Sequence, residues 1–262
     1  MVAEGDPILN RVPDKLGPRS AHDSHANFVG ALKECVTDTL LNLDELQLAV
    51  AGEQAERLFF TATISPKAEL QAAGRLKPGL LGEGESFMIV GRKGNAGQMA
   101  IKLFAGHREP GFVCDNGMIT GESLLMHKRQ TLNLDLRAEL LAGLQLFLGE
   151  AENLGQARLI ARAAPITDQQ AWAYSARLLH EKVITQAVFN EALKNYFQPD
   201  ASMVDCHPRA RLGLAGSFTR AFRPLSAPRK LAATQRVTED LVVNPPEEWV
   251  GSTGPINMWR AN

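Results

Sequence analysis

Several features that assign a function at once are absent from this chain of 262 residues. No apolar run approaches the length of about 18 residues that a membrane-spanning helix needs. The three cysteines are widely spaced and form no CxxC pair, which argues against a disulfide framework and a structural zinc site. The first residues are acidic and interrupted by prolines, unlike a signal peptide. We therefore expect a cytoplasmic protein.

Cofactor and metal motifs are equally scarce. The segment GRKGNAG (91–97) resembles a phosphate-binding glycine loop, but it lacks the Lys-Ser/Thr pair and a following helix. His22 and His25 lie close together, and Cys206 adjoins His207, yet neither pair has the companions that a metal centre requires. We expect no cofactor and no bound metal.

Aromatic residues make up only 6% of the chain, so its core must consist mainly of Leu, Ala, Val and Ile. The net charge of −1 gives no general attraction to nucleic acid or to an anionic membrane. This charge is unevenly distributed, however. Residues 1–85 hold thirteen acidic and eight basic side chains, whereas residues 207–236 hold seven basic and no acidic ones. A positive surface therefore remains compatible with the small net charge.

The hydrophobic pattern changes period along the chain. Helical spacing predicts one or two helices between about 26 and 50, and β-branched and aromatic residues predict a strand over 57–65. Alternating apolar segments separated by Gly and Asn predict an antiparallel β-meander of four or five strands at about 86–132. Helical periodicity resumes at Leu134, with two more helices expected after Thr167.

These elements predict an α+β fold in which the β-meander packs with N-terminal and C-terminal helices. We expect an extended N-terminal arm over 1–25, a single domain over 26–245 and an irregular C-terminal tail over 246–262.

The segment GFVCDNGMITGES (111–123) places Cys114 just before the Asn116-Gly117 pair. A catalytic cysteine needs a lowered pKa, which His107 and Arg108 are close enough in sequence to suggest. Cys114 follows Phe112 and Val113 in an apolar strand pattern, however, and a buried cysteine usually acts as a small hydrophobic residue. We favour the packing interpretation and assign no catalytic residue. The sequence leaves open whether the protein is an enzyme, and favours a non-enzymatic role.

The basic stretch 207–236 is the strongest functional signal. Its arginines alternate with Phe218 and Phe222, a mixture suited to phosphate contact and base stacking. The alternative is a solvated face whose arginines pair with the acidic first third, with both Phe rings in the core. A hairpin tip with Arg92 and Lys93 either contacts a phosphate backbone or is a plain solvated turn. The candidate nucleic-acid-binding residues are Arg92, Lys93, Lys102, Arg220, Arg223, Arg229 and Lys230.

The segment 111–123 and the hairpin before it resemble a family of phage- and plasmid-borne proteins of unknown function, also found in prophages of enteric bacteria. The matching residues are Phe112, Val113, Cys114, Asn116, Gly117, Gly121, Glu122 and Ser123. The resemblance covers about 85–130 and supplies no catalytic residues. It implies a bacterial host and a mobile-element setting near anti-restriction and DNA-repair-like genes.

Two functions remain in view. The first is a non-enzymatic DNA-associated protein that binds or anneals single-stranded DNA in recombination. Such a protein could act as a homo-oligomer. The second is an anti-defence inhibitor that binds a host restriction or CRISPR protein through the acidic segment 1–85. A Cys114-dependent hydrolase or transferase is a third, weaker hypothesis.

Overall fold

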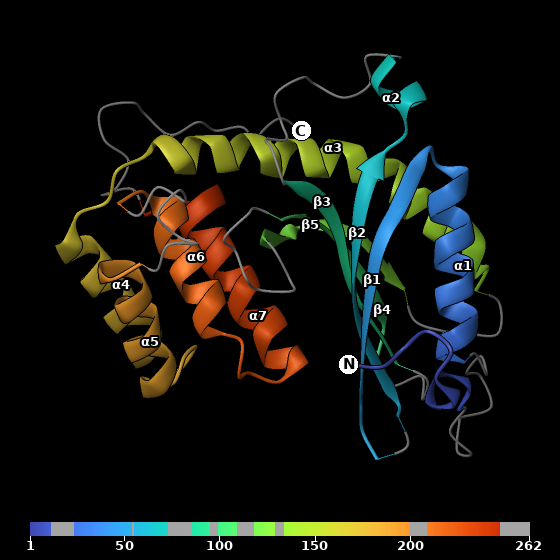
Figure 1. Ribbon diagram of the computed structural model, residues 1–262, viewed down its shortest axis with the longest axis horizontal. Helices are drawn as coiled ribbons and strands as arrows, with labels where there is room; N and C mark the ends of the chain where they lie inside the picture. Colours follow the sequence, from blue (N-terminus) through green and yellow to red (C-terminus); the bar gives the residue numbers. More distant parts are fainter. Residues whose placement is uncertain are drawn as a thin grey trace.

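The computed structural model describes residues 1–11, 24–53, 55–72, 85–94, 99–108, 118–128, 134–199 and 209–246. A five-stranded sheet lies at one end of the molecule and a group of helices at the other (Figure 1). One long helix, α3 (Leu136–Ala163), runs along both parts and connects them.

The sheet is an antiparallel meander in which each strand pairs with the next one along the chain, in the order β1-β2-β3-β4-β5. This confirms the predicted α+β class with a meander sheet. The meander begins earlier than predicted, because two of its strands precede residue 86. The strands are β1 (Leu41–Ala51), β2 (Arg57–Pro66), β3 (Ser86–Gly94), β4 (Ile101–Arg108) and β5 (Met118–Lys128).

The prediction of helix throughout 26–50 is wrong in its second half. Helix α1 (His25–Asp38) begins at Ser24, whose hydroxyl accepts a hydrogen bond from the backbone of Asn27. The chain then reverses at Leu40, where φ is +59°, and continues as β1. Apolar residues alternate along β1 and face α1, so burial on one side of a sheet overrides the helical spacing. These residues are Leu46, Leu48 and Val50.

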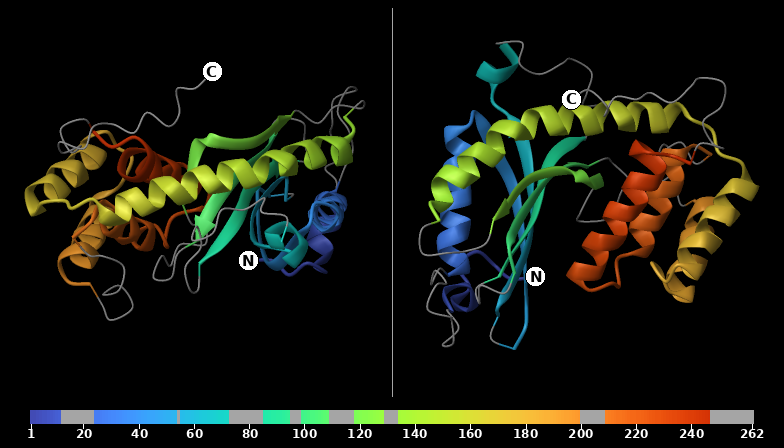
Figure 2. Two further views of the ribbon diagram at one scale, coloured as in Figure 1. Left: turned by 90° about the horizontal axis from the view of Figure 1, so that it is seen from above. Right: turned by 180° about the vertical axis from the view of Figure 1, so that it is seen from behind.

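The two faces of the sheet have different coverings. The inner face carries Phe60, Ile89 and Leu103, which pack against α1 and the first half of α3 in one hydrophobic core. The outer face carries the alternate residues of each strand. Helix α7 (Ala227–Thr238) covers part of it, with Leu231 packed on Met88 and Val90 (Figure 2).

The helical lobe has a second core around α6 (Arg211–Ala221), which is buried on nearly every side. Helices α4 (Asp168–His180) and α5 (Gln186–Phe197) confirm the two helices predicted after Thr167. The hydroxyl of Thr167 accepts a hydrogen bond from the backbone of Gln170, as expected at a helix start. A short π-helix, η2 (Glu239–Val243), follows α7.

Residues 1–11 lie on the sheet part. The backbone of Val2 bridges to Leu48 on β1, and Leu9 in the short 3-10 helix η1 (Pro7–Asn10) is fully buried. The remaining short helix is α2 (Ala68–Ala72). Within the described ranges, no helix is both long and apolar enough to cross a membrane.

Candidate nucleic-acid interface

A row of nitrogen-bearing side chains crosses the outer face of the sheet. Arg92 on β3 lies opposite Phe59 on β2 and opposite Lys102 on β4, and Lys102 lies opposite His127 on β5. Residues directly opposite each other in antiparallel strands share a face, so these four side chains form one line across four strands. We call Arg92, Lys102 and His127 the basic row.

Arg92 and Lys102 are adjacent like charges. In the part of the chain that the structure describes, neither side chain forms an ion pair, and Arg92 Nε is buried without a hydrogen-bond partner. Like charges directly opposite each other destabilise a sheet by about 0.2–1 kcal/mol. A bound anion would remove this cost, so the pair is better explained by a ligand than by folding.

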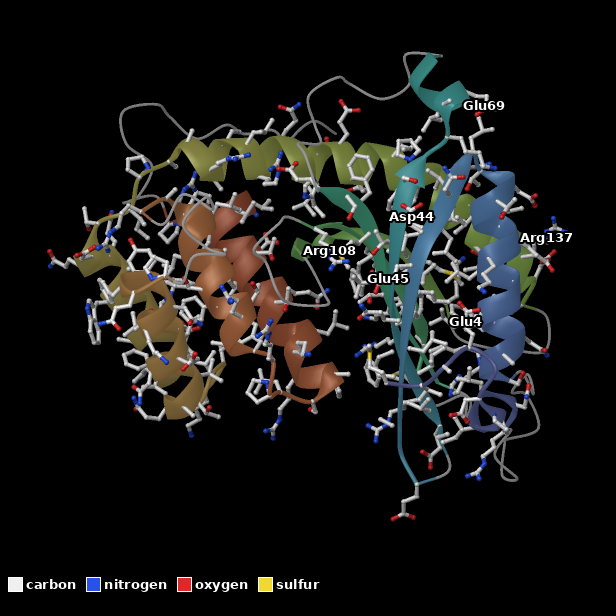
Figure 3. All side chains as sticks on the ribbon, viewed as in Figure 1. Glu4, Asp44, Glu45, Glu69, Arg108 and Arg137 are labelled. Carbon is white, nitrogen blue, oxygen red and sulfur yellow. The ribbon has the colours of Figure 1, made fainter. Side chains whose placement is uncertain are left out.

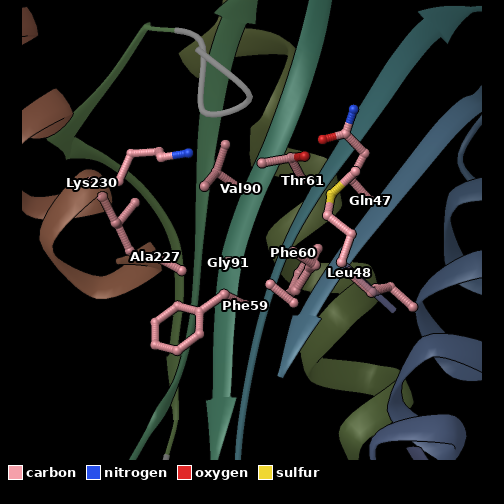
Figure 4. A pocket seen from close by; sticks show the side chains of 12 residues that line it. Gln47, Leu48, Phe59, Phe60, Thr61, Val90, Gly91, Ala227 and Lys230 are labelled. Carbon is pink, nitrogen blue, oxygen red and sulfur yellow. The ribbon is translucent and has the colours of Figure 1, made fainter. Parts of the chain in front are cut away.

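The basic row borders a groove between the sheet and α7. The groove has a volume of about 200 Å³, and its sheet side includes Phe59, Thr61 and Val90. Lys230 and Leu231 line its α7 side, and Figure 4 shows Lys230 across from Val90 and Phe59. Phe59, the neighbour of Arg92, is thus a wall of this groove.

At the opposite end of the outer face, a positive side chain is paired with a negative one. Glu45 on β1 accepts a hydrogen bond of 3.1 Å from Arg108 on β4, and Figure 3 labels the two side chains close together. A hydrogen bond from Gln47, and secondarily this ion pair, lower the pKa of Glu45. The uncompensated positive charge of this face is therefore at the basic row.

Lys93 does not belong to this surface. It follows Arg92 in the strand, so its side chain lies on the inner face, where it is fully buried. Lys93 lies close enough to His25 to affect its ionisation. The pKa of His25 is lowered to about 4, mainly by burial and secondarily by the charge of Lys93. The expectation that Lys93 contacts nucleic acid with Arg92 is corrected, because adjacent strand residues face opposite sides.

Three of the six arginines in the 207–236 stretch also differ from their expected roles. Arg211 is buried, and Arg236 binds Asp240 at 2.8 Å and Glu181 at 3.1 Å. Arg209 binds Asp168 at 2.5 Å. The partners of Arg209 and Arg236 are therefore carboxylates of the helical lobe and not of the acidic first third.

Phe218 and Phe222 are fully buried in the core of the helical lobe. Their spacing reflects packing along α6, and stacking on bases is excluded for both in this fold. The alternative interpretation, in which both Phe rings lie in the core, is thus confirmed.

The remaining candidates separate into two places. Lys230 lies in the groove beside the sheet, whereas Arg220 and Arg223 line a different hollow beside α5. Arg229 is exposed on α7. The structure therefore brings Arg92, Lys102 and Lys230 to the sheet face, and leaves Arg220 and Arg223 apart from them.

The sequence did not indicate three further cationic candidates: Arg57 and His127 on the sheet, and Lys194, which lines the hollow beside α5 with Arg220 and Arg223. Arg57 precedes Phe59 by two residues and so shares its face, a relation visible in the strand pattern once the strand is assigned. His127 could be identified only from the pairing of β4 with β5.

The hypothesis of a Cys114-dependent enzyme stays untested by the structure. Cys114, Asn116 and Gly117 lie outside the described residues. Cys35 is buried beneath α3, and burial raises the pKa of its thiol. Over the described ranges, no group of three His, Cys, Asp or Glu residues is placed to hold a metal ion.

Comparison of the chain with protein-family models, with curated proteins and with solved structures finds no match. The site must therefore be interpreted from its own residues.

Proposed function

We propose that this protein binds single-stranded nucleic acid on the outer face of its sheet and acts without catalysis, annealing strands in recombination. The observation that carries the proposal is the Arg92–Lys102 pair, two cross-strand cations that have no anionic partner within the described residues. Phosphate groups of a nucleic-acid backbone supply regularly spaced anions of the kind such a pair lacks.

The groove favours a single strand over a duplex. Proteins that bind single strands combine a cationic track with aromatic side chains on which unpaired bases stack. Here the cations Arg92 and Lys102 adjoin Phe59, which is 7% exposed and lines the groove, so a base would contact the part of its ring that faces the groove. The groove lies between a sheet and a helix and holds about 200 Å³, which suits a single base better than a double helix.

The first test is fluorescence anisotropy of a labelled thymidine oligonucleotide over a series of salt concentrations. Binding should strengthen as salt falls, with a slope of about −0.7 per phosphate contacted, and a duplex of equal length should bind at least about tenfold more weakly. No affinity at about 50 mM salt would eliminate the proposal.

The second test reverses the two charges. The double variant Arg92→Glu/Lys102→Glu should weaken binding by about tenfold or more and reduce the salt slope by about 1.4, because two phosphate contacts are lost. Lys182→Glu is the control, since Lys182 is an exposed cation of the helical lobe, at the turn before α5, and its reversal makes half the charge change of the double variant. Equal loss in the control would show that only overall charge matters.

The groove wall has its own test. Phe59→Leu preserves an apolar side chain at this buried position but removes the ring. A stacked base contributes about 1–3 kcal/mol, so affinity should fall by roughly fivefold or more while the salt slope stays constant.

Inhibition of a host defence protein by acidic mimicry has less support. Glu4, Asp38 and Glu45 in the acidic first third are already paired with Lys33, Arg137 and Arg108. These carboxylates are therefore partly neutralised, which weakens a surface meant to imitate a polyanion.

A further inference from the structure

We infer a second ligand site in the helical lobe: a phosphate-binding hollow between α5 and the turn that joins α6 to α7. The hollow has a volume of about 790 Å³. It lies on other elements than the basic row, so this inference does not depend on nucleic-acid binding by the sheet.

Three cations, from two helices and the turn that follows one of them, line the hollow. Lys194 comes from α5, Arg220 from the last turn of α6, and Arg223 from the turn that follows. Among the described residues that line the hollow, Glu191 is the one carboxylate, beside these three cations. Over the residues that the structure describes, Lys194 and Arg223 form no ion pair.

Helix stability alone does not account for this arrangement. A cation in the last turn of a helix is favourable, which explains Lys194 and Arg220 individually. Arg223 lies beyond the end of α6 and is exposed, yet it lines the same hollow. Lys194 and Arg223 come from separate elements and repel each other, so their placement on one hollow points to an anion between them.

The other lining groups fit a phosphate ester that carries a sugar or base. Asn195 and Gln198 provide amide groups, and Thr185 provides a hydroxyl. Val188, Pro224 and Leu225 provide an apolar wall. A volume of about 790 Å³ is within the range of small-molecule sites and accommodates one nucleotide. The ligand is therefore a nucleotide phosphate, either a free nucleotide or the 5′-phosphorylated end of a strand.

Isothermal titration calorimetry of the full chain tests the site. The probes are pyrophosphate, ATP without metal, and a five-residue thymidine oligonucleotide with either a 5′-phosphate or a 5′-hydroxyl group. The charge-neutralising variant is Lys194→Gln/Arg223→Gln. Lys182→Gln is the control, because Lys182 is an exposed cation near the start of α5 that does not line the hollow.

We expect the native protein to bind pyrophosphate, and the double variant to bind it about tenfold or more weakly, because two charge-assisted contacts are lost. The control should retain native affinity for pyrophosphate, and Arg92→Glu/Lys102→Glu should retain the part of the binding that Lys194→Gln/Arg223→Gln removes. Preference for the 5′-phosphorylated oligonucleotide identifies a strand end as the ligand, and preference for ATP identifies a free nucleotide.

Absence of pyrophosphate, ATP and oligonucleotide binding at low salt would overturn the site, as would equal weakening by the double variant and by Lys182→Gln. Circular dichroism melting of each variant shows that lost binding is not lost folding. If the sheet variant abolishes oligonucleotide binding but spares pyrophosphate, the two sites are distinct. If only the sheet proposal fails, pyrophosphate binding persists while the 5′-hydroxyl oligonucleotide does not bind.

Discussion

Arg92 on β3 lies directly opposite Lys102 on β4, on the face of the sheet away from α1 and the first half of α3. Two adjacent cations destabilise the free protein and stabilise a complex with an anion. Stability and binding should therefore respond in opposite directions to the same substitution.

Lys102→Glu converts this like-charge pair into an Arg92–Glu pair. We expect the free energy of unfolding to rise by about 0.2–1 kcal/mol at low salt, while oligonucleotide affinity falls. Urea denaturation checks the first effect, and about 1 M salt should remove it by screening. Arg92→Glu/Lys102→Glu restores a like-charge pair, so its free energy of unfolding should not rise above that of the native protein. A destabilised Lys102→Glu variant would contradict this interpretation of the pair.

His25 makes the fold sensitive to acid. Its ring Nε2–H donates to the carbonyl of Ala55 at 2.7 Å, and burial with the charge of Lys93 lowers its pKa to about 4. In the unfolded chain the pKa of His25 is about 6.5, so between pH 6.5 and 4 the unfolded state binds more protons at this residue than the folded state does. Stability should therefore be full above pH 6.5 and fall by roughly 3 kcal/mol as the pH drops to 4.

The measurement is urea denaturation of the native protein and of His25→Gln at pH 7, 6, 5 and 4. Gln retains a donor for the Ala55 carbonyl but does not titrate, so the variant should lose less stability than the native protein on acidification. Parallel pH profiles for the two proteins would show that another group is responsible.

Glu85 and Arg158 form a buried ion pair that ties the start of β3 to the second half of α3. Glu85 Oε1 accepts from Arg158 Nη1 at 2.5 Å, and the two side chains are 4% and 1% exposed. Arg162 Nη1 lies 3.6 Å from the same carboxylate oxygen. Glu85→Gln removes the charge of Glu85 from beside a buried guanidinium and should cost about 3–5 kcal/mol.

Denaturation of Glu85→Gln and of Glu85→Gln/Arg158→Met tests this pair. The double variant removes the buried charge as well, so it should be less destabilised than the single one. Additive losses in the double variant would mean that the two groups act independently.

Two glycines should respond oppositely to substitution by alanine. A Cβ atom on Gly91 of β3 would lie 2.5 Å from Phe60 Cζ and 2.8 Å from Leu103 Cδ2, so Gly91→Ala should cost about 1–3 kcal/mol. Gly149 in α3 has no such neighbour within 4 Å, and Gly149→Ala should gain about 0.5–1 kcal/mol from helix propensity. Thermal denaturation of both variants measures the difference, and equal effects would contradict the packing at Gly91.

Elements with a strong local pattern were predictable. The 3.6-residue spacing of Leu140, Leu144 and Phe147 indicates α3, and these residues do face the first core. The segment 41–51 was not predictable as a strand, because its leucines satisfy both helical and alternating spacing. Its conformation depends on pairing with β2, which is a contact with a later part of the chain.

The sequence by itself determined that helices and a meander sheet would form and that cations would gather in 207–236, since spacing and composition are local properties. Only the tertiary structure decided which cations are available to a ligand. Arg92 and Lys93 are neighbours in the chain, yet the pleat places one beside the groove and the other in the core. Arg223 and Lys194 are far apart in the chain, yet the packing of α5 against α6 brings them to one hollow. The sequence states which side chains are charged, but long-range packing decides which of them are exposed and which lie close together.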